Sequence, residues 1–151
     1  MPGTGPRPMA KLLAMSDRDP DCLFCKIIAR ELPGQIVAED ERTVAFMDIN
    51  PATRGHVLVV PRRHARNLLE IDPEDLSATV LAAQRVARRA NQRLGCDGVN
   101  LINSCGAAAW QTVFHLHVHV IPRYADDPLH LPWVPAPGDA DEIAAAAQEL
   151  R

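Results

Sequence analysis

Apolar and polar residues alternate between Phe114 and Ile121, where the chain reads Phe-His-Leu-His-Val-His-Val-Ile. A period of two is typical of a β-strand, whose successive side chains point to opposite faces. We therefore expect His115, His117 and His119 to share one face of a strand. Burying such side chains without partners costs about 1–3 kcal/mol each, which favours a functional site over simple packing. A solvent face that happens to be rich in histidine is the alternative.

The pattern elsewhere predicts further strands and helices. The expected strands span residues 35–38, 43–48, 55–61, 99–103 and 112–121, and the expected helices lie within 22–32, between Asp72 and Gly95, and after Asp139 or Asp141. Asp72 with Pro73 at the start and Gly95 at the end are typical helix boundaries. A hairpin, a helix and two more adjacent strands describe an antiparallel sheet with helices packed on it, hence an α+β fold.

The long helix carries its apolar residues along one stripe, which we expect to comprise Leu76, Val80, Ala83, Ala87, Ala90 and Leu94. This stripe faces either the sheet or a second subunit, and the sequence leaves both uses open. The arginines at other positions of the helix are most simply a solvated flank: Arg85, Arg88, Arg89 and Arg93.

The length of 151 residues indicates one folded domain. Residues 1–19 are rich in Pro and Gly and show no signal-peptide pattern, so we expect a flexible extension over 1–20. The folded domain is expected over 21–125, followed by a proline-rich tail with a terminal helix over 126–151. The hydrophobic fraction of 47% is ordinary for a soluble domain.

Charge and cysteine content narrow the function classes. The net charge of -3 gives no general attraction to nucleic acid, although Arg62, Arg63, His64 and Arg66 form a basic cluster that is more simply a solvated loop. The sequence contains no apolar run of membrane-spanning length. We expect a cytoplasmic protein, in which the four cysteines are thiols or metal ligands rather than disulfides.

A catalytic metal held by all three alternating histidines is a poor fit. The outer two Cα atoms of such a strand lie roughly 13 Å apart, whereas Zn–N bonds are about 2.0–2.1 Å long. Both outer rings would have to lean past the middle one. Acid–base or nucleophilic chemistry at neutral pH therefore suits the row better.

The string His115-Leu-His-Val-His-Val-Ile121, preceded by Gln111-Thr112-Val113, resembles the signature of the histidine triad (HIT) superfamily of nucleotide hydrolases and transferases. Three other features agree with it, in the expected order: residues 45–51, residues 55–64 and Asn103. The resemblance covers about Cys22 to Tyr124. It implies a five-stranded antiparallel sheet with a long helix and a short N-terminal helix, the sheet being extended across a homodimer.

The resemblance also implies a reaction. His117 would attack the α-phosphorus of a purine nucleoside phosphoramidate or dinucleotide (AMP or GMP type), forming a covalent nucleotidyl-histidine that water then cleaves. The backbone carbonyl of His115 would hold the other nitrogen of the His117 ring. His119 would stabilise charge on the phosphate oxygens. Further contacts to the phosphate or the triad are expected from Gln111, Thr112 and His56.

The nucleoside would bind to four other residues by the same resemblance. Asp48 would accept the ribose hydroxyls, Phe46 and Ile49 would flank the base, and Asn103 would lie on the phosphate side. An acid that merely caps a turn is the alternative for Asp48. Ordinary core positions are the alternative for Phe46 and Ile49.

Cys22-x-x-Cys25 is half of a zinc-ligand pattern. Some bacterial members of the family that the chain resembles complete such a site with two histidines, which here are His64 and His115. A closed Cys₂His₂ set implies a structural zinc and no catalytic metal. An unmetallated pair of thiols is the alternative.

Two positions bear on the branch of the family. Trp110 stands where many members have Gly, and its ring is expected to narrow the leaving-group side. Leu116 argues against the transferase branch, which has proline inside its motif. Two rival functions remain open: a nucleotide sensor or partner-binding module with little turnover, and a zinc-dependent hydrolase that uses the histidine row as ligands.

Overall fold

The computed structural model describes residues 18–151, so most of the expected extension over 1–20 lies outside the described residues. The elements, in chain order, are α2 (Leu23–Ile28), β1 (Ile36–Glu39), β2 (Thr43–Met47), β3 (Val57–Pro61), α3 (Pro73–Leu94), β4 (Gly98–Ile102), the 3₁₀ helix η1 (Ala107–Ala109), β5 (Val118–Arg123) and α4 (Ala140–Leu150). The N-terminal helix is shorter than expected, because Arg30 adopts a left-handed φ of 60° soon after its end.

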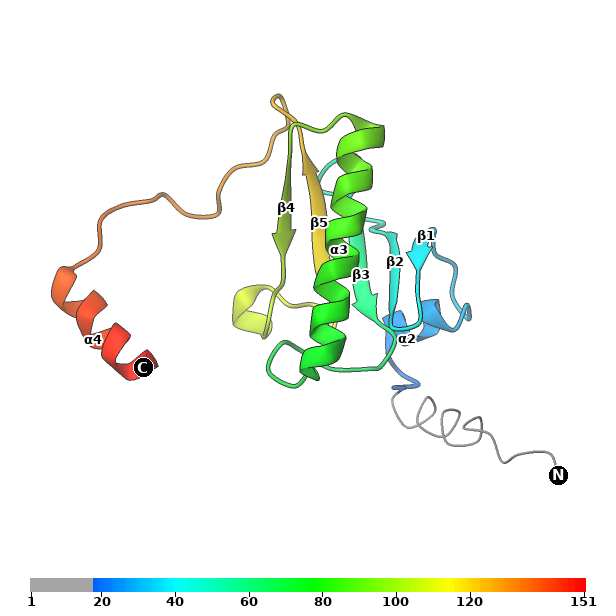
Figure 1. Cartoon of the computed structure of the whole chain (residues 1–151), viewed down its shortest axis with the longest axis horizontal. Helices are drawn as coiled ribbons and strands as arrows, with labels where there is room; N and C mark the ends of the chain where they lie inside the picture. Colours follow the sequence, from blue (N-terminus) through cyan, green and yellow to red (C-terminus); the bar gives the residue numbers. More distant parts are fainter. Residues whose placement is uncertain (1–17) are drawn as a thin grey trace.

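The five strands form one antiparallel sheet in the order β1-β2-β3-β5-β4, which confirms the α+β prediction. β3 lies at the centre and is buried along its whole length, as its continuous apolar run predicts. α3 covers one face of the sheet (Figure 1). On the other face, Phe24 and Ile27 of α2 pack with Phe46, Leu58 and Val60. The site described below lies on this α2 side.

α3 has the boundaries that its sequence predicts. The carboxylate of Asp72 accepts the amide proton of Glu74 at 2.9 Å, and Gly95 ends the helix in the left-handed conformation with φ 64°. The expected apolar stripe faces the sheet only in part, since Ala83 and Ala90 are buried but Val80 is 44% exposed, and for Val80 the alternative of a second subunit stays open. The buried face instead runs through Asp75, Thr79, Ala82, Ala83, Val86 and Ala90. Small side chains there let the helix approach the sheet closely.

β5 begins at Val118 rather than at Thr112, so that part of the strand prediction is wrong. The backbone before it bonds to other partners than a neighbouring strand: the Leu116 amide donates to the Ala65 carbonyl at 2.7 Å, and the Asn103 side chain donates to the His117 carbonyl at 2.9 Å. Pro122 lies within the strand instead of ending it. β5 pairs with β3 only as far as Val120, so the lack of an amide proton at Pro122 costs no hydrogen bond to β3.

The chain beyond β5 leaves the sheet beside β4 and ends in α4, which stands apart from the other elements (Figure 1). Asp139 caps this helix by accepting the Glu142 amide proton at 3.0 Å, as the sequence predicts. None of the residues of α4 is buried. Within residues 18–151, every helix is too short or too polar to cross a membrane.

Candidate functional site

The three histidines of the alternating row divide between two adjacent sites. The ring of His115 is fully buried and turns toward Cys22 and Cys25. The rings of His117 and His119 lie 4.9 Å apart, centroid to centroid, and line a cleft. The expectation that all three share one face of a strand is therefore wrong, because His115 and His117 both precede β5 and only His119 lies within it.

The cleft has a volume of about 480 Å³ and opens between α2, the end of β2 and the segment that carries the histidines. Its wall is largely apolar, and its polar side chains include Asp48, Asn50 and Thr112 besides the two histidines. The structure places six of the sequence-predicted residues in the lining: Phe46, Asp48, Ile49, Thr112, His117 and His119. Four predicted residues lie outside it: His56, Asn103, Gln111 and His115.

His117 is held in one tautomer. Its Nδ1 lies 2.8 Å from the His115 carbonyl oxygen, which can only accept, so Nδ1 carries the proton and Nε2 keeps a free lone pair. Phe24 meets the ring edge-on at 5.1 Å between centroids and fixes its plane. Burial lowers the pKa of His117, so the ring is neutral at pH 7. A neutral imidazole with a free nitrogen at a cleft is a ready nucleophile.

His119 is held in the opposite tautomer by His56. The Ala52 amide donates to Nδ1 of His56 at 3.0 Å, so the proton of the His56 ring is on Nε2. That nitrogen lies 2.9 Å from Nδ1 of His119, which must accept. The proton of His119 is therefore on Nε2, as a donor for the cleft. Burial, with the neighbouring His117 and His56, lowers the pKa of His119 to about 4.

Asp48 caps a turn and also lines the cleft. One carboxylate oxygen accepts the Asn50 amide proton at 2.8 Å, which caps a turn, while the other lies 3.5 Å from Nε2 of His56. Phe46 is a core residue that also lines the cleft, packed edge-on against Phe24 at 5.3 Å between centroids. Ile49 is 89% exposed at the cleft, so the core alternative is wrong for this residue.

Gln111 and Asn103 act on the backbone instead of facing the cleft. The buried Gln111 amide donates to the Arg66 and Val113 carbonyls at 2.7 and 3.1 Å, and its oxygen accepts the Gly106 amide proton at 2.8 Å. The side-chain nitrogen and oxygen of Gln111 are thus both bonded to backbone groups. Asn103 fixes the His117 carbonyl, and its own Oδ1 is buried without a partner among the described residues.

Trp110 is 68% exposed and adopts a left-handed φ of 72° at the end of η1. Its ring does not line the cleft. The expected narrowing of the cleft by this ring is therefore absent.

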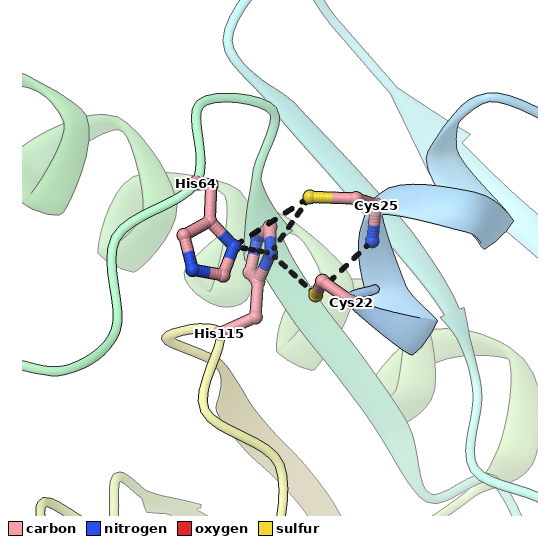
Figure 2. Close-up of side chains that lie close together, drawn as sticks. All are labelled: Cys22, Cys25, His64 and His115. Atoms are coloured by element: carbon pink, nitrogen blue, oxygen red, sulfur yellow. Dashed lines mark hydrogen bonds between the residues drawn. The ribbon is translucent and has the colours of Figure 1, made fainter. Parts of the chain in front are cut away.

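A second cluster lies next to the cleft, built from three separate segments (Figure 2). Cys22 and Cys25 come from the start of α2, His64 from the loop after β3, and His115 from the segment before β5. Nδ1 of His115 lies 3.4 and 3.5 Å from the two sulfur atoms and 3.2 Å from Nδ1 of His64, which is 3.6 Å from the Cys25 sulfur.

These separations are those of a tetrahedral metal site. Bond lengths of about 2.3 Å to sulfur and 2.0–2.1 Å to nitrogen place ligand atoms about 3.6 Å apart for S and N and about 3.3 Å apart for N and N. Nε2 of His115 lies 2.8 Å from the Pro61 carbonyl and must donate to it, which leaves the Nδ1 lone pair facing the sulfur atoms. The four residues could therefore hold a metal ion.

The family model of the HIT domain matches residues 29–126. The chain belongs to the HIT domain family. A solved structure of SMU.412c from Streptococcus mutans is 39% identical, with a TM-score of 0.84 over 90% of this chain and 87% of that one. A Zn-bound histidine triad family protein from Mycobacterium smegmatis is 38% identical (TM-score 0.71, 86% and 95% of the chains). A histidine triad nucleotide-binding protein from Candida albicans is 29% identical (TM-score 0.76, 86% and 94%).

Burial sets the protonation of two side chains in this HIT domain's cysteine site. Burial raises the pKa of the Cys25 thiol to about 11 and lowers the pKa of His115 to about 4. The imidazole is therefore a neutral ligand, and a bound cation would displace the thiol proton. Among the described residues, no metal-ligand group unites His115, His117 and His119.

The apolar wall of the HIT cleft contains residues that the sequence reasoning missed. Leu23, Phe24 and Ile27 of α2 line the cleft, together with Leu32 and Pro33. The helix was predicted, but its function in the site was not. The available signal was that its apolar residues flank the CxxC pair, whose sulfur atoms lie beside His115.

Proposed function

We propose that this HIT domain is a nucleotidyl hydrolase that cleaves purine nucleoside phosphoramidates or dinucleoside polyphosphates at the α-phosphate through a covalent nucleotidyl-His117. The observation that carries the proposal is the pair of opposite tautomers at one cleft. His117 presents a lone pair on Nε2, and His119, 4.9 Å away between ring centroids, presents a proton on Nε2. A nucleophile beside a hydrogen-bond donor is what attack on a phosphate requires.

In the first step Nε2 of His117 bonds to the α-phosphorus and the bond to the leaving group breaks. The ring becomes cationic, and the hydrogen bond from Nδ1 to the His115 carbonyl stabilises that charge. His119 donates to a non-bridging phosphate oxygen, and Thr112, which also lines the cleft, offers a second polar side chain. The leaving group takes up a proton from His119 or from water.

In the second step water attacks the phosphorus and the P–N bond breaks. The products are the nucleoside monophosphate, a proton and the neutral His117 ring. The buried environment that lowers the pKa of His117 also destabilises its cationic, nucleotidylated form, which makes it a good leaving group.

The nucleoside occupies the other end of the cleft. Asp48 accepts the ribose hydroxyls, and the base lies between Ile49 and the apolar wall that includes Phe46 and Phe24. The volume of about 480 Å³ is in the range of small-molecule sites. The similarity to a histidine triad nucleotide-binding protein of Candida albicans supports a nucleotide as the ligand.

We assign zinc to the Cys22, Cys25, His64 and His115 cluster, in a structural role. Four protein ligands leave no open position for substrate. The similarity to a Zn-bound protein of Mycobacterium smegmatis supports zinc as the metal. When bound, zinc ties α2 to the segment that carries His117 and so holds the cleft wall in place. The thiols fit the cytoplasm, where cysteines stay reduced.

We also propose a homodimer in which β4 pairs with β4 of a second copy. β4 is an edge strand of the sheet and exposes Leu101 at 45% and Ile102 at 41%. An exposed apolar edge strand is a template for pairing with another chain.

A binding module with little turnover is the second candidate. The observation in its favour is Gln111, whose side chain is bound to the loop backbone and does not face the cleft. The phosphate end therefore has one donor fewer than the sequence suggests.

The test is a turnover assay with adenosine phosphoramidate and a panel of dinucleoside polyphosphates, run with the wild type and His117→Gln, and with His130→Gln as an exposed control. Hydrolysis should depend on His117 and survive treatment with a chelator at temperatures where the fold persists. Tight nucleotide binding with no hydrolysis of any substrate would favour the binding module. Loss of hydrolysis on metal removal from a still-folded chain would favour a zinc-dependent hydrolase.

A further inference from the structure

A groove of about 320 Å³ lies beside α3, outside the cleft and the cysteine cluster. It runs between the C-terminal half of α3 and the first three strands, on the side of α3 away from β4 (Figure 1). Its apolar lining is Val37, Met47, Val57, Val86, Ala90 and Leu94, and its charged lining is Arg54, Arg89 and Arg93. No step of the proposed hydrolysis uses these arginines.

The three guanidinium groups lack acidic partners within residues 18–151. Arg54 and Arg93 make no side-chain hydrogen bond or ion pair there, and Arg89 reaches only the Val37 carbonyl at 3.5 Å. Arg85, one turn earlier on α3, pairs with Asp40 at 2.9 Å. The groove therefore presents unneutralised positive charge above an apolar floor, and it fits an anionic partner with an apolar face.

α4 has that chemistry. Its apolar residues Ile143, Ala147 and Leu150 recur at spacings of four and three and so share one face of the helix. Glu142 and Glu149, seven positions apart, lie together along one flank of that face. Ile143 is 60% exposed and Leu150 is 89% exposed, and the two glutamates have no ion-pair partner in the described part of the chain.

The placement of α4 points to a second copy rather than to its own groove. The C-terminal arm, residues 124–151, carries α4 out beyond β4, whereas the groove lies on the β1 side of α3 (Figure 1). β4 is also the free edge at which a second copy would pair. The arm of each copy thus extends toward the place where its partner would lie.

We propose that α4 of one copy binds in the groove beside α3 of a second copy, reciprocally, with Glu142 and Glu149 facing Arg89 and Arg93. The contact has a consequence for the cleft. Met47 lines both the groove and the cleft, and Arg54 and Gly55 directly precede His56. Docking of the partner's helix therefore steadies the turn that positions Asp48 and His56. This inference requires a second copy but not hydrolysis.

Charge reversal in the full-length chain tests the contact in trans. One variant carries Arg89→Glu and Arg93→Glu, and the other carries Glu142→Arg and Glu149→Arg. Each alone should weaken self-association about tenfold or more, because like charges would face each other. Mixed in equal amounts, the two variants should form heterodimers in preference to either homodimer, since both contacts regain opposite charges. Native mass spectrometry counts the species, and sedimentation velocity measures the dissociation constants.

The matched controls are Arg88→Glu, an exposed arginine of α3 outside the groove, and Asp141→Arg, on the opposite side of α4. Both should leave association unchanged. A statistical mixture of homodimers and heterodimers would overturn the proposal while leaving β4 pairing intact. A third variant carries all four substitutions in one chain. If association recovers only in this variant, and the mixture of the other two shows no preference for heterodimers, α4 docks within its own copy and the proposal is overturned. Neither outcome depends on the hydrolysis assay.

Discussion

Nε2 of His56 donates to Nδ1 of His119 across 2.9 Å, although the two residues are 63 positions apart in the chain. The direction of this hydrogen bond is fixed, because the other ring nitrogen of His56 already accepts the Ala52 amide proton. His56 does not line the cleft, yet it decides which nitrogen of His119 presents a proton to it. It is a positioning residue in the proposed mechanism.

Replacing His56 should therefore slow catalysis without weakening binding. We expect His56→Phe to lower kcat by about 10–100-fold with little change in KM, since His119 is then free to adopt the wrong tautomer. His56→Gln keeps an N–H group near Nδ1 of His119 and should recover part of the loss. Steady-state kinetics on a phosphoramidate substrate measure both constants. Equal losses in the two variants, with a raised KM, would show that His56 serves only the fold.

The lowered pKa of His119 makes stability depend on pH. The unfolded chain binds a proton at this ring below the ordinary value of 6.5, whereas the folded chain does so only near 4. Between these values the unfolded state holds more protons, so the free energy of unfolding falls as pH falls through this window and is independent of this group above it.

Urea unfolding at several pH values checks that prediction as a difference between the wild type and His119→Gln. Subtracting the variant removes contributions from other groups. The difference should be constant above pH 6.5 and should decrease from there toward pH 4. A difference that is flat over the whole range would contradict the neutral, buried state of His119.

Asp48 should contribute to binding more than to chemistry. We expect Asp48→Asn to weaken nucleoside monophosphate binding by about 1.5–3 kcal/mol, the range for hydrogen bonds to a charged group, with a smaller effect on the single-turnover rate at saturation. Calorimetry with AMP and with its 2′,3′-dideoxy analogue gives a double-mutant cycle. The two perturbations should not add. Asp126→Asn, an exposed aspartate outside the cleft, is the control.

Zinc removal should lower the free energy of unfolding, while the chain that remains folded should still hydrolyse its substrate. Metal at one hundred times its dissociation constant adds about 2.7 kcal/mol to the free energy of unfolding, so a chelator or Cys22→Ser should lower the melting temperature markedly. Cys105→Ser, a cysteine outside the cluster, should not. Thermal scans with metal analysis check both variants. Equal melting temperatures with and without metal would show that the metal does not stabilise the fold.

The fold was predictable where local signals and tertiary packing agree. Asp72 and Gly95 bound α3 as expected, and the apolar run of β3 lies at the centre of the sheet. The start of β5 was not predictable, since the alternation before Val118 also suits a segment whose backbone is bonded by Ala65 and Asn103. Those partners come from distant parts of the chain, which periodicity does not report.

The sequence predicted which residues form the site better than it predicted where their side chains point. The alternating spacing identified His117 and His119, and the resemblance to the HIT superfamily added Asp48; all three line the cleft. The direction of the Gln111 side chain depends on which carbonyl and amide groups of the surrounding loops lack partners. The role of Phe24 depends on how α2 packs. Both are tertiary properties.

The central claim is a bond between Nε2 of His117 and phosphorus. The direct measurement is the mass of the intact chain, quenched within one turnover of an adenosine phosphoramidate, followed by peptide mapping of the adduct. We predict a gain equal to one adenylyl group, located on His117 and absent from His117→Gln. Substrate turnover by the wild type with no adduct at any quench time, or with the adduct on another residue, would contradict the mechanism.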